Sequence, residues 1–295
     1  MLNVCIVGCG AMGRNHMKGW QERSDARIVS VCDLLEDRLQ SMAEATGAAP
    51  YRDYRDAIRH EGVTVVSVAV PTYLHSPITV FAAEHGRHVL SEKPIALTLE
   101  EAEAAVNAAE KHGVRFAVSF KYRGHDKTRT CQRLCREGAF GGPIFYRFAD
   151  LREVRPKTAM NRTTMNGGPV IHMACHLVDR LYVITGEEPR TVFAGGHVYG
   201  ADTERLRPFH DHAIDAAAIE VRYDGGHVLS LYLNWGMPEN FPAYTEEVII
   251  GPKLTVRPAG QDLRVQYPDH LELWPNRRAT PAVRINDLAD AIQGR

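Results

Sequence analysis

Long hydrophobic runs are absent from this sequence, and no apolar stretch approaches the ~18 residues that a membrane-spanning helix needs. The start also lacks a secretory signal, which would combine a basic segment, an apolar stretch and a small-residue cleavage site. Instead, MLNVCIVGCG runs directly into a strand pattern and a glycine turn. We therefore expect a cytoplasmic protein with no membrane association.

An excess of charge of either sign is also lacking. The chain has 35 Lys and Arg against 36 Asp and Glu, which gives a formal net charge of −1. This balance gives the chain as a whole no electrostatic attraction to nucleic acid or to a membrane surface. We expect a small-molecule substrate as the partner, with no nucleic acid.

Paired cysteine motifs are missing, because no two of the six cysteines form a C-x-x-C pair. A zinc ribbon and a thioredoxin-like redox site are therefore not expected. Most of the cysteines lie in apolar or helical segments, and we interpret them as buried thiols in a reducing compartment. Internal repeats and low-complexity tracts are absent as well.

The first 121 residues alternate between two periodicities. Strands are predicted at 2–7, 27–32, 63–70, 87–90 and 114–120, and helices at 11–23, 35–46, 77–84 and 99–111. Strands and helices joined by short connections are typical of a parallel sheet covered by helices on both faces. With 295 residues the chain is long enough for two domains. We predict an α/β Rossmann-type domain, a doubly wound parallel sheet, over residues 1–121.

Residues 122–295 have a different pattern. Helices are predicted near 128–137, at 169–185 and at 281–292, and strands at 144–153, 190–198, 216–223, 227–235, 245–250, 262–267 and 270–274. The turn Asp224-Gly225-Gly226 is a strong hairpin signal. The pattern predicts an α+β domain with a mostly antiparallel open sheet. An open sheet face is a natural contact surface, so we expect a homodimer or homotetramer.

A glycine motif, G-x-G-x-x-G, follows the first strand and opens the first helix. Gly8 permits the tight turn, Gly10 lets a pyrophosphate approach, and Gly13 allows helix and strand to pack closely. The helix start presents free N–H groups to the phosphates. The residues of this loop predicted to bind the cofactor are Gly8, Gly10, Ala11, Met12 and Gly13.

Asp33 ends the second strand, about 20 residues after the glycine motif. A carboxylate at this position accepts hydrogen bonds from the ribose hydroxyls and repels a 2′-phosphate. The sequence therefore favours NAD over NADP, although Arg38 nearby softens that preference.

Several segments together resemble the glucose-fructose oxidoreductase and inositol dehydrogenase family, Gfo/Idh/MocA. They are the glycine loop, Pro71-Thr72-Tyr73-Leu74-His75, His88-Val89-Leu90-Ser91-Glu92-Lys93-Pro94, Lys121-Tyr122-Arg123, and the stretch from Gly167 through His176 to Asp179. The likeness covers about residues 1–186. It implies further cofactor contacts at Pro71, Thr72, His75, Glu92 and Lys93.

Lys93 and His176 are the predicted catalytic residues. Lys93 follows a parallel strand, where open α/β sheets bind ligands, and its ammonium group can polarise a substrate oxygen. The resemblance implies the same role and a cis peptide bond before Pro94. It also implies that His176 carries the hydroxyl proton, which suits an imidazole with an ordinary pKa near ~6.5.

His172 lies four residues before His176 on the predicted helix, so the two side chains share a face. The resemblance places an aspartate at this position, and here an imidazole is expected to bind a substrate hydroxyl. Two alternatives stay open, a buried core histidine and a metal site completed by Asp179. No metal is expected, because the implied chemistry needs none.

Tyr122 and Arg123 follow the last strand of the first domain and are predicted to contact the substrate or the nicotinamide ribose. The alternative for Arg123 is a salt bridge at the domain seam. The segment 154–165 carries Arg155, Lys157 and Arg162. It is interpreted either as a substrate loop that recognises an acid or phosphate group, or as a solvated loop.

These features predict an NAD(P)-dependent dehydrogenase or reductase that acts on a hydroxyl or keto group of a sugar, an inositol or a sugar-derived acid. Two alternatives are a glycoside-cleaving enzyme that retains its NAD and a non-catalytic nucleotide-binding protein. The resemblance also implies a final segment that folds back onto the first domain. The chain stops at Arg295, so we expect the second domain, 122–295, to have a shortened C-terminus.

Overall fold

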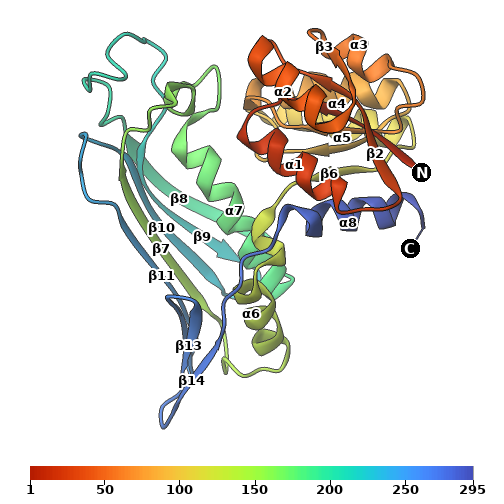
Figure 1. The fold of residues 1–295 in the computed structure, drawn as a ribbon. Coiled ribbons are helices and arrows are strands. Elements are labelled where there is room, and N and C mark those ends of the chain that lie inside the picture. Colours follow the sequence, from red (N-terminus) through yellow and green to blue (C-terminus); the bar gives the residue numbers. More distant parts are fainter. Residues whose placement is uncertain (295) are drawn as a thin grey trace. The chain divides into compact units, whose positions relative to one another are not determined.

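The computed structural model describes residues 1–294 and divides the chain into two compact units (Figure 1). Unit 1 contains Met1–Lys121 together with the residues from Thr280 onward, and unit 2 contains Tyr122–Ala279. Each unit has its own sheet and its own buried core.

Unit 1 is a six-stranded sheet in the order β3-β2-β1-β4-β5-β6, and all of its strands pair in parallel. The strands are β1 Leu2–Val7, β2 Ala26–Cys32, β3 Ala49–Tyr51, β4 Val65–Val68, β5 His88–Ser91 and β6 Phe116–Val118. The helices are α1 Ala11–Gln21, α2 Glu36–Thr46, α3 Tyr54–Arg59, α4 His75–Glu84 and α5 Leu99–Lys111, with a short 3₁₀ turn η1 at Thr72–Leu74. This order confirms the predicted Rossmann-type sheet, whose direction of winding reverses between β1 and β4.

The sheet of unit 1 is buried on both faces. Along β1, Val4 and Ile6 belong to one apolar cluster, whereas Cys5 and Val7 belong to another. Side chains alternate between the faces of a strand, so a strand covered on both sides must be apolar throughout. This explains why the strands of the first domain are recognisable as unbroken apolar runs.

The last helix, α8 at Pro281–Ile292, packs against α1 in unit 1. Ile285 and Leu288 join the apolar cluster that contains Trp20. Gly19 permits this approach, because a Cβ atom there would lie 2.6 Å from Cδ1 of Ile285. The expectation that residues 122–295 form one domain is therefore wrong for the residues from Thr280 onward, and a fold-back segment is present.

Unit 2 is an eight-stranded sheet in the order β14-β13-β12-β11-β7-β10-β9-β8. The strands are β7 Phe145–Glu153, β8 Pro189–His197, β9 Ala216–Tyr223, β10 Val228–Met237, β11 Tyr244–Ile250, β12 Thr255–Ala259, β13 Asp262–Gln266 and β14 Leu271–Pro275. Only β7 and β10 pair in parallel, so the prediction of a mostly antiparallel sheet is confirmed. The predicted hairpin at Asp224-Gly225-Gly226 joins β9 to β10.

The helices of unit 2 are α6 at Asp126–Arg136 and α7 at Gly168–Thr185. A short 3₁₀ turn precedes each of them, η2 at Lys121–Gly124 before α6 and η3 at Thr158–Asn161 before α7. Leu177 and Leu181 of α7 share a buried cluster with Leu229, Leu231 and Leu233 of β10. Helix α7 therefore covers one face of the sheet.

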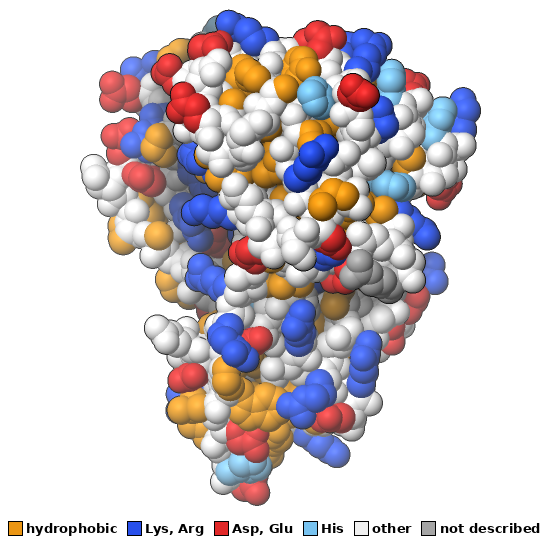
Figure 2. Space-filling model, turned by 45° about the vertical axis from the view of Figure 1, so that its right-hand side comes forward, with side chains coloured by type: hydrophobic (Ala, Val, Ile, Leu, Met, Phe, Trp, Pro, Cys, Tyr) orange, Lys and Arg blue, Asp and Glu red, His pale blue; other side chains and the backbone are white. Residues whose placement is uncertain are grey.

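The strand register places a group of exposed apolar side chains on the opposite face of this sheet. They are Phe145, Phe193, Tyr232, Tyr244 and Ile250, called the open face below. Figure 2 shows acidic and basic side chains intermixed on the surface in view, as the balanced composition predicts. Within residues 1–294 no helix is both long and apolar enough to cross a membrane.

Candidate functional site

The glycine loop joins β1 to α1 at the point where the winding of the sheet reverses. Gly8 has a φ of +98°, and a Cβ atom there would lie 2.4 Å from the carbonyl oxygen of Ala69. A Cβ on Gly13 would lie 1.8 Å from the carbonyl oxygen of Gly8. At Gly10 the nearest atom to a Cβ would be Nη1 of Arg38, at 3.9 Å, so space remains above the start of α1. The start of a helix with open space in front of it favours the binding of an anion such as a pyrophosphate.

Asp33 is fixed beside the glycine loop at the end of β2. Its Oδ2 accepts a hydrogen bond from the backbone N–H of Cys9 at 2.7 Å, and its Oδ1 accepts one from Leu35 at 2.9 Å. A carboxylate oxygen can accept more than one hydrogen bond, so both oxygens retain capacity for ribose hydroxyls. The loop and Asp33 therefore form one site within unit 1.

The segment after β4 is tied to the segment after β5 by His75. Its Nδ1 lies 2.6 Å from the carbonyl oxygen of Pro94, and its Nε2 lies 2.9 Å from that of Val70. Burial lowers the pKa of His75, although both carbonyl groups act in the opposite direction. Of the neighbouring residues, Pro71 is exposed and Thr72 is buried. The ring therefore serves as a brace between two strand ends.

Glu92, directly after β5, carries a buried carboxylate. Its Oε1 lies 3.0 Å from Nε2 of His16 and accepts a hydrogen bond from Oγ of Ser119 at 2.9 Å. Burial alone would raise the pKa of Glu92, but its interactions with His16, Ser119 and Arg284 lower it to about 2. Arg284 also reaches this network, since its Nε donates to Oγ of Ser119 at 2.6 Å.

Lys93 follows Glu92 and is partly exposed at the carboxyl end of β5. The peptide bond between Lys93 and Pro94 is cis, as the resemblance implied. The backbone N–H of Lys93 donates to Oε2 of Glu92 at 3.3 Å. The buried carboxylate therefore braces the backbone that carries the lysine.

His176 lies on α7 in unit 2 with only 2% of its surface exposed. Its ring stacks on that of Tyr122, with centroids 4.5 Å apart and planes inclined by 25°. The guanidinium carbon of Arg180, one helical turn further along, lies 3.9 Å from the centroid of the Tyr122 ring. Tyr122 therefore packs against both residues of α7.

A buried charge cluster fixes Arg180. Its Nη1 donates to Oε1 of Glu247 at 2.6 Å and to the hydroxyl oxygen of Tyr146 at 2.7 Å. Lys127 pairs with the other carboxylate oxygen of Glu247. Burial lowers the pKa of Lys127 to about 8, and it would raise that of Glu247, but the two cations outweigh this effect and lower it. The position of Tyr122 against Arg180 is thus set by a rigid polar cluster.

Arg123 pairs with Asp179 of α7. Its Nε donates to both carboxylate oxygens at 3.0 Å, and its Nη2 donates to Oδ1 at 2.5 Å. The salt-bridge interpretation of Arg123 thus describes its contact in unit 2. Both oxygens of Asp179 are used by the arginine, and across residues 1–294 no three His, Cys, Asp or Glu side chains are arranged to hold a metal ion.

The predicted site residues fall into two groups, one in each unit. Unit 1 holds the predicted cofactor residues, Gly8, Gly10, Ala11, Met12, Gly13, Asp33, Pro71, Thr72, His75, Glu92 and Lys93. Unit 2 holds Tyr122, Arg123, His172 and His176. Ala11 and Met12 are exposed at the start of α1, where an incoming ligand can reach them.

Comparison with known families covers both units. Residues 2–120 match the family model described as an oxidoreductase family with an NAD-binding Rossmann fold. Residues 128–257 match the Gfo/Idh/MocA C-terminal domain. The chain belongs to the Gfo/Idh/MocA family.

Among curated Gfo/Idh/MocA relatives, the chain is 30% identical over 202 residues to D-apiose dehydrogenase of Paraburkholderia graminis, which covers 66% of the chain and 53% of that protein. It is 26% identical over 226 residues to myo-inositol 2-dehydrogenase of Thermotoga maritima, and this match covers 76% of the chain and 66% of that protein. The chain thus spans between half and two thirds of these relatives.

Among solved structures, aldose-aldose oxidoreductase of Caulobacter crescentus superposes with a TM-score of 0.82 at 24% identity. The superposition covers 100% of this chain and 90% of that one. At this identity the likeness shows the Gfo/Idh/MocA fold alone.

Three residues of this Gfo/Idh/MocA chain were not predicted to belong to the site. His16 and Arg284 reach the Glu92 network from α1 and α8, and Trp235 of β10 contacts His172, with ring centroids 6.0 Å apart. A lone histidine within the first helix was the one available signal for His16. Nothing local marked Arg284 or Trp235, because their partners lie on distant parts of the chain.

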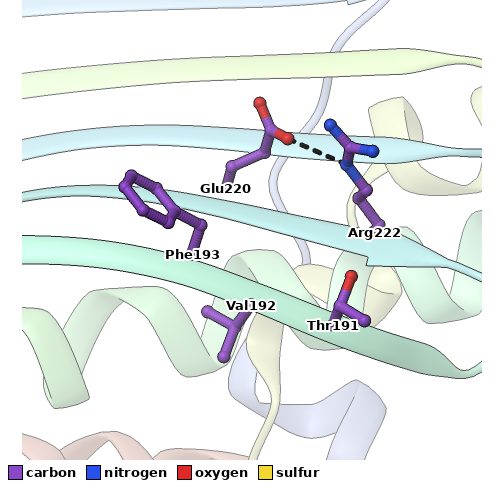
Figure 3. A pocket seen from close by; sticks show the side chains of 5 residues that line it. All are labelled: Thr191, Val192, Phe193, Glu220 and Arg222. Atoms are coloured by element: carbon purple, nitrogen blue, oxygen red, sulfur yellow. Dashed lines mark hydrogen bonds and ion pairs between the residues drawn. The ribbon is translucent and has the colours of Figure 1, made fainter.

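A depression on the sheet of unit 2 lies away from these groups. It is lined by Thr191, Val192 and Phe193 of β8 and by Glu220 and Arg222 of β9 (Figure 3). Glu220 and Arg222 pair with each other at 3.0 Å. The other lining side chains carry no group suited to hydride or proton transfer, and the two charged side chains neutralise each other. We therefore do not assign the chemical site to this depression.

Proposed function

We propose that this chain is an NAD-dependent dehydrogenase that oxidises a hydroxyl group of a sugar, an inositol or a sugar-derived acid, or reduces the corresponding ketone. The observation that carries the proposal is Lys93, which lies at the carboxyl end of β5 in the same unit as the glycine loop and Asp33. Relatives with the names D-apiose dehydrogenase and myo-inositol 2-dehydrogenase support a polyhydroxylated substrate.

The proposed chemistry divides between two side chains. Bound NAD would supply the hydride acceptor. Lys93 would donate a hydrogen bond to the substrate oxygen and stabilise the negative charge that develops there. His176 would take the hydroxyl proton, so that the CH–OH group loses one proton and one hydride and becomes a C=O group. In the reverse direction His176 would return the proton.

Other residues would prepare these two groups. Asp33 would bind the ribose hydroxyls, and the Glu92 network would hold the backbone of Lys93 in place. Tyr122 would restrict the ring of His176 by stacking, which favours one orientation for proton transfer. His172, one turn before His176 on α7, would contact another part of the substrate.

Two further proposals concern the surroundings of the enzyme. We propose a cytoplasmic location, supported by six cysteines that all carry free thiols. We also propose a homodimer formed through the open face, because exposed aromatic side chains grouped on a sheet are typical of association surfaces.

A substrate panel tests the proposed activity. Polyols, aldoses, uronic acids and their glycosides are incubated with the full chain and NAD, and both NADH absorbance and substrate consumption are followed. We expect net NADH formation in proportion to substrate consumed. Cleavage of a glycoside without net NADH, or NAD binding without any turnover across the panel, would contradict a dehydrogenase.

A further inference from the structure

Two arginines and a histidine gather around one tryptophan in unit 2. Trp235 of β10 is 2% exposed. The guanidinium carbon of Arg155 lies 4.1 Å from the centroid of the tryptophan ring, and that of Arg152 lies 5.3 Å from it. The imidazole of His172 approaches the same ring from α7 at 6.0 Å. Side chains from β7, from the segment after it and from α7 therefore converge on one aromatic surface.

The charge of Arg152 is balanced by Asp150. This fully buried carboxylate accepts hydrogen bonds from Nε of Arg152 at 2.8 and 2.9 Å, from Nε1 of Trp235 at 2.8 Å and from Oγ1 of Thr245 at 2.7 Å. Four hydrogen bonds use most of its acceptor capacity. Asp150 is therefore committed to its present partners.

The charge of Arg155 is not balanced in this way. No carboxylate of residues 1–294 lies within ion-pair distance of its guanidinium group, which is partly buried against Trp235. Burial and repulsion from Arg152 lower the pKa of Arg155, and the weaker attraction of Asp150 only partly offsets them. Partial burial of an unpaired cation is costly, and the cost is removed when an anion binds to it.

A carboxylate is the anion that matches this cluster best. A guanidinium group is planar and can donate two parallel hydrogen bonds to a carboxylate. One uncompensated positive charge balances one negative charge, whereas a phosphate ester carries about −1.5 to −2 at neutral pH. The cluster therefore favours a monoanion.

The position of the cluster on α7 relates it to the proposed proton carrier. His172 and His176 are four residues apart, which corresponds to about 6 Å along the helix. A sugar acid has a comparable distance between a ring hydroxyl and its carboxylate. One such molecule can therefore reach His176 with its hydroxyl and the Trp235 cluster with its acid group.

Asn161 provides a second observation in the segment that carries Arg155. Its side chain is 1% exposed, and neither its amide nitrogen nor its amide oxygen has a hydrogen-bond partner within the described residues. A buried amide group that forms no hydrogen bonds destabilises the folded state. This residue ends η3, which packs against α7, so a polar molecule bound beside α7 would reduce that cost.

We propose that Arg155, stacked on Trp235, binds the carboxylate of the substrate, and that the substrate is a sugar acid rather than a neutral sugar or polyol. This inference rests on the proposed dehydrogenase function, whose site it extends. It also assigns a role to the basic segment 154–165, for which the sequence left open either acid recognition or simple solvation.

The test compares acids with their neutral parents. D-glucuronate is paired with D-glucose and D-galacturonate with D-galactose, and D-glucose 6-phosphate serves as the phosphate arm. Each is assayed with the full chain, with Arg155→Gln, with Arg155→Lys and with Arg257→Gln, which removes an exposed arginine of β12 as a matched control. Binding of each uronate to the NAD-loaded protein is measured by calorimetry.

We expect a uronate to be preferred over its neutral parent in kcat/KM. Arg155→Gln should lower kcat/KM for the uronate by about 10- to 100-fold, mainly through KM, because a hydrogen bond to a charged group is lost. The neutral parent should be unaffected, Arg155→Lys should restore part of the loss, and Arg257→Gln should behave as wild type. Partial rescue by lysine separates charge recognition from a folding defect.

Preference for the neutral parents, equal losses on acid and parent, or a stronger preference for the phosphate would overturn the inference. Calorimetry separates this failure from failure of the proposed function. If a uronate binds through Arg155 and no NADH forms with any compound, the binding inference stands and the dehydrogenase proposal fails. If neutral sugars are oxidised while no uronate binds, the dehydrogenase proposal stands and the binding inference fails.

Discussion

Glu92 is an ionised carboxylate that is almost wholly removed from solvent at the end of β5. Hydrogen bonds from Ser119 and a close contact with His16 keep it charged, and through the backbone N–H of Lys93 it braces the proposed catalytic lysine. When such a buried carboxylate is protonated, its interactions with these partners weaken and the folded state becomes less stable. This sensitivity leads to a prediction on acid stability.

The pKa of Glu92 is lowered from an ordinary value of 4.5 to about 2, so the folded state binds its proton less readily than the unfolded state. The resulting stabilisation is fully present above the ordinary pKa and is lost as pH falls toward 2. Its full size is about 3 kcal/mol. Chemical unfolding of wild type and of Glu92→Gln between about pH 5 and pH 2 should show the two free energies of unfolding converging as pH falls.

Glu110→Gln is the matched control, because Glu110 is exposed on α5. The free energy of unfolding of Glu110→Gln should differ from that of wild type by a small and nearly constant amount over the same pH range. A gap between wild type and Glu92→Gln that does not narrow in acid would show that the carboxylate contributes no pH-dependent stability.

The local geometry of the glycine loop could be predicted from the sequence, whereas long-range pairings could not. Gly8, Gly13 and Asp33 act through turn geometry and spacing, which are visible within about 30 residues of chain. His16 and Glu92 are 76 residues apart, and they meet only because β1 and β5 share a sheet. The pairing of Arg123 with Asp179 likewise depends on how η2 meets α7.

At the scale of elements, periodicity located most helices and strands to within two residues. It missed β3 and α3, which have three and six residues and are too short for a periodic pattern. It also missed β12, where Pro258 argues against a strand within a sheet. Helix α8 was predicted, but an amphipathic pattern does not identify the surface that it covers.

The open face of the unit 2 sheet leads to a prediction on assembly. Phe193 is 82% exposed on β8, and Tyr232 and Tyr244 lie on the same face. If this face forms the proposed homodimer, Phe193→Glu places a charge in an apolar contact and should shift the chain from dimer to monomer. Sedimentation or light scattering measures the change, and circular dichroism verifies that the fold is retained.

A charge on a surface outside this face is the control. Phe193→Glu should be compared with Leu99→Glu, since Leu99 is also strongly exposed but lies on α5 of unit 1. A wild-type chain that is monomeric, or a Phe193→Glu variant that assembles as wild type does, would contradict the open face as the dimer surface.

At the scale of the whole molecule, composition and periodicity indicated two domains, and the structure divides after Lys121. The return of the chain to unit 1 after Ala279 was not predicted from the residues, because it depends on tertiary packing of α8 against α1. The side chains proposed to bind an acid group could not be predicted to form one cluster, for a similar reason. Arg152, Arg155, His172 and Trp235 are spread over more than 80 residues and form a cluster only in the folded sheet.

We propose above that Lys93 and His176 are both required for one hydride-transfer reaction, and this proposal is the centre of the account. The most direct test is the turnover of Lys93→Met and His176→Asn with the best substrate of the panel, alongside NADH binding measured by fluorescence. Lys111→Met and His210→Asn, both on exposed positions, are the controls. We predict NADH affinity close to wild type and kcat lower by about 10²- to 10⁴-fold in each active-site variant. Turnover at the wild-type rate in either one would contradict the account.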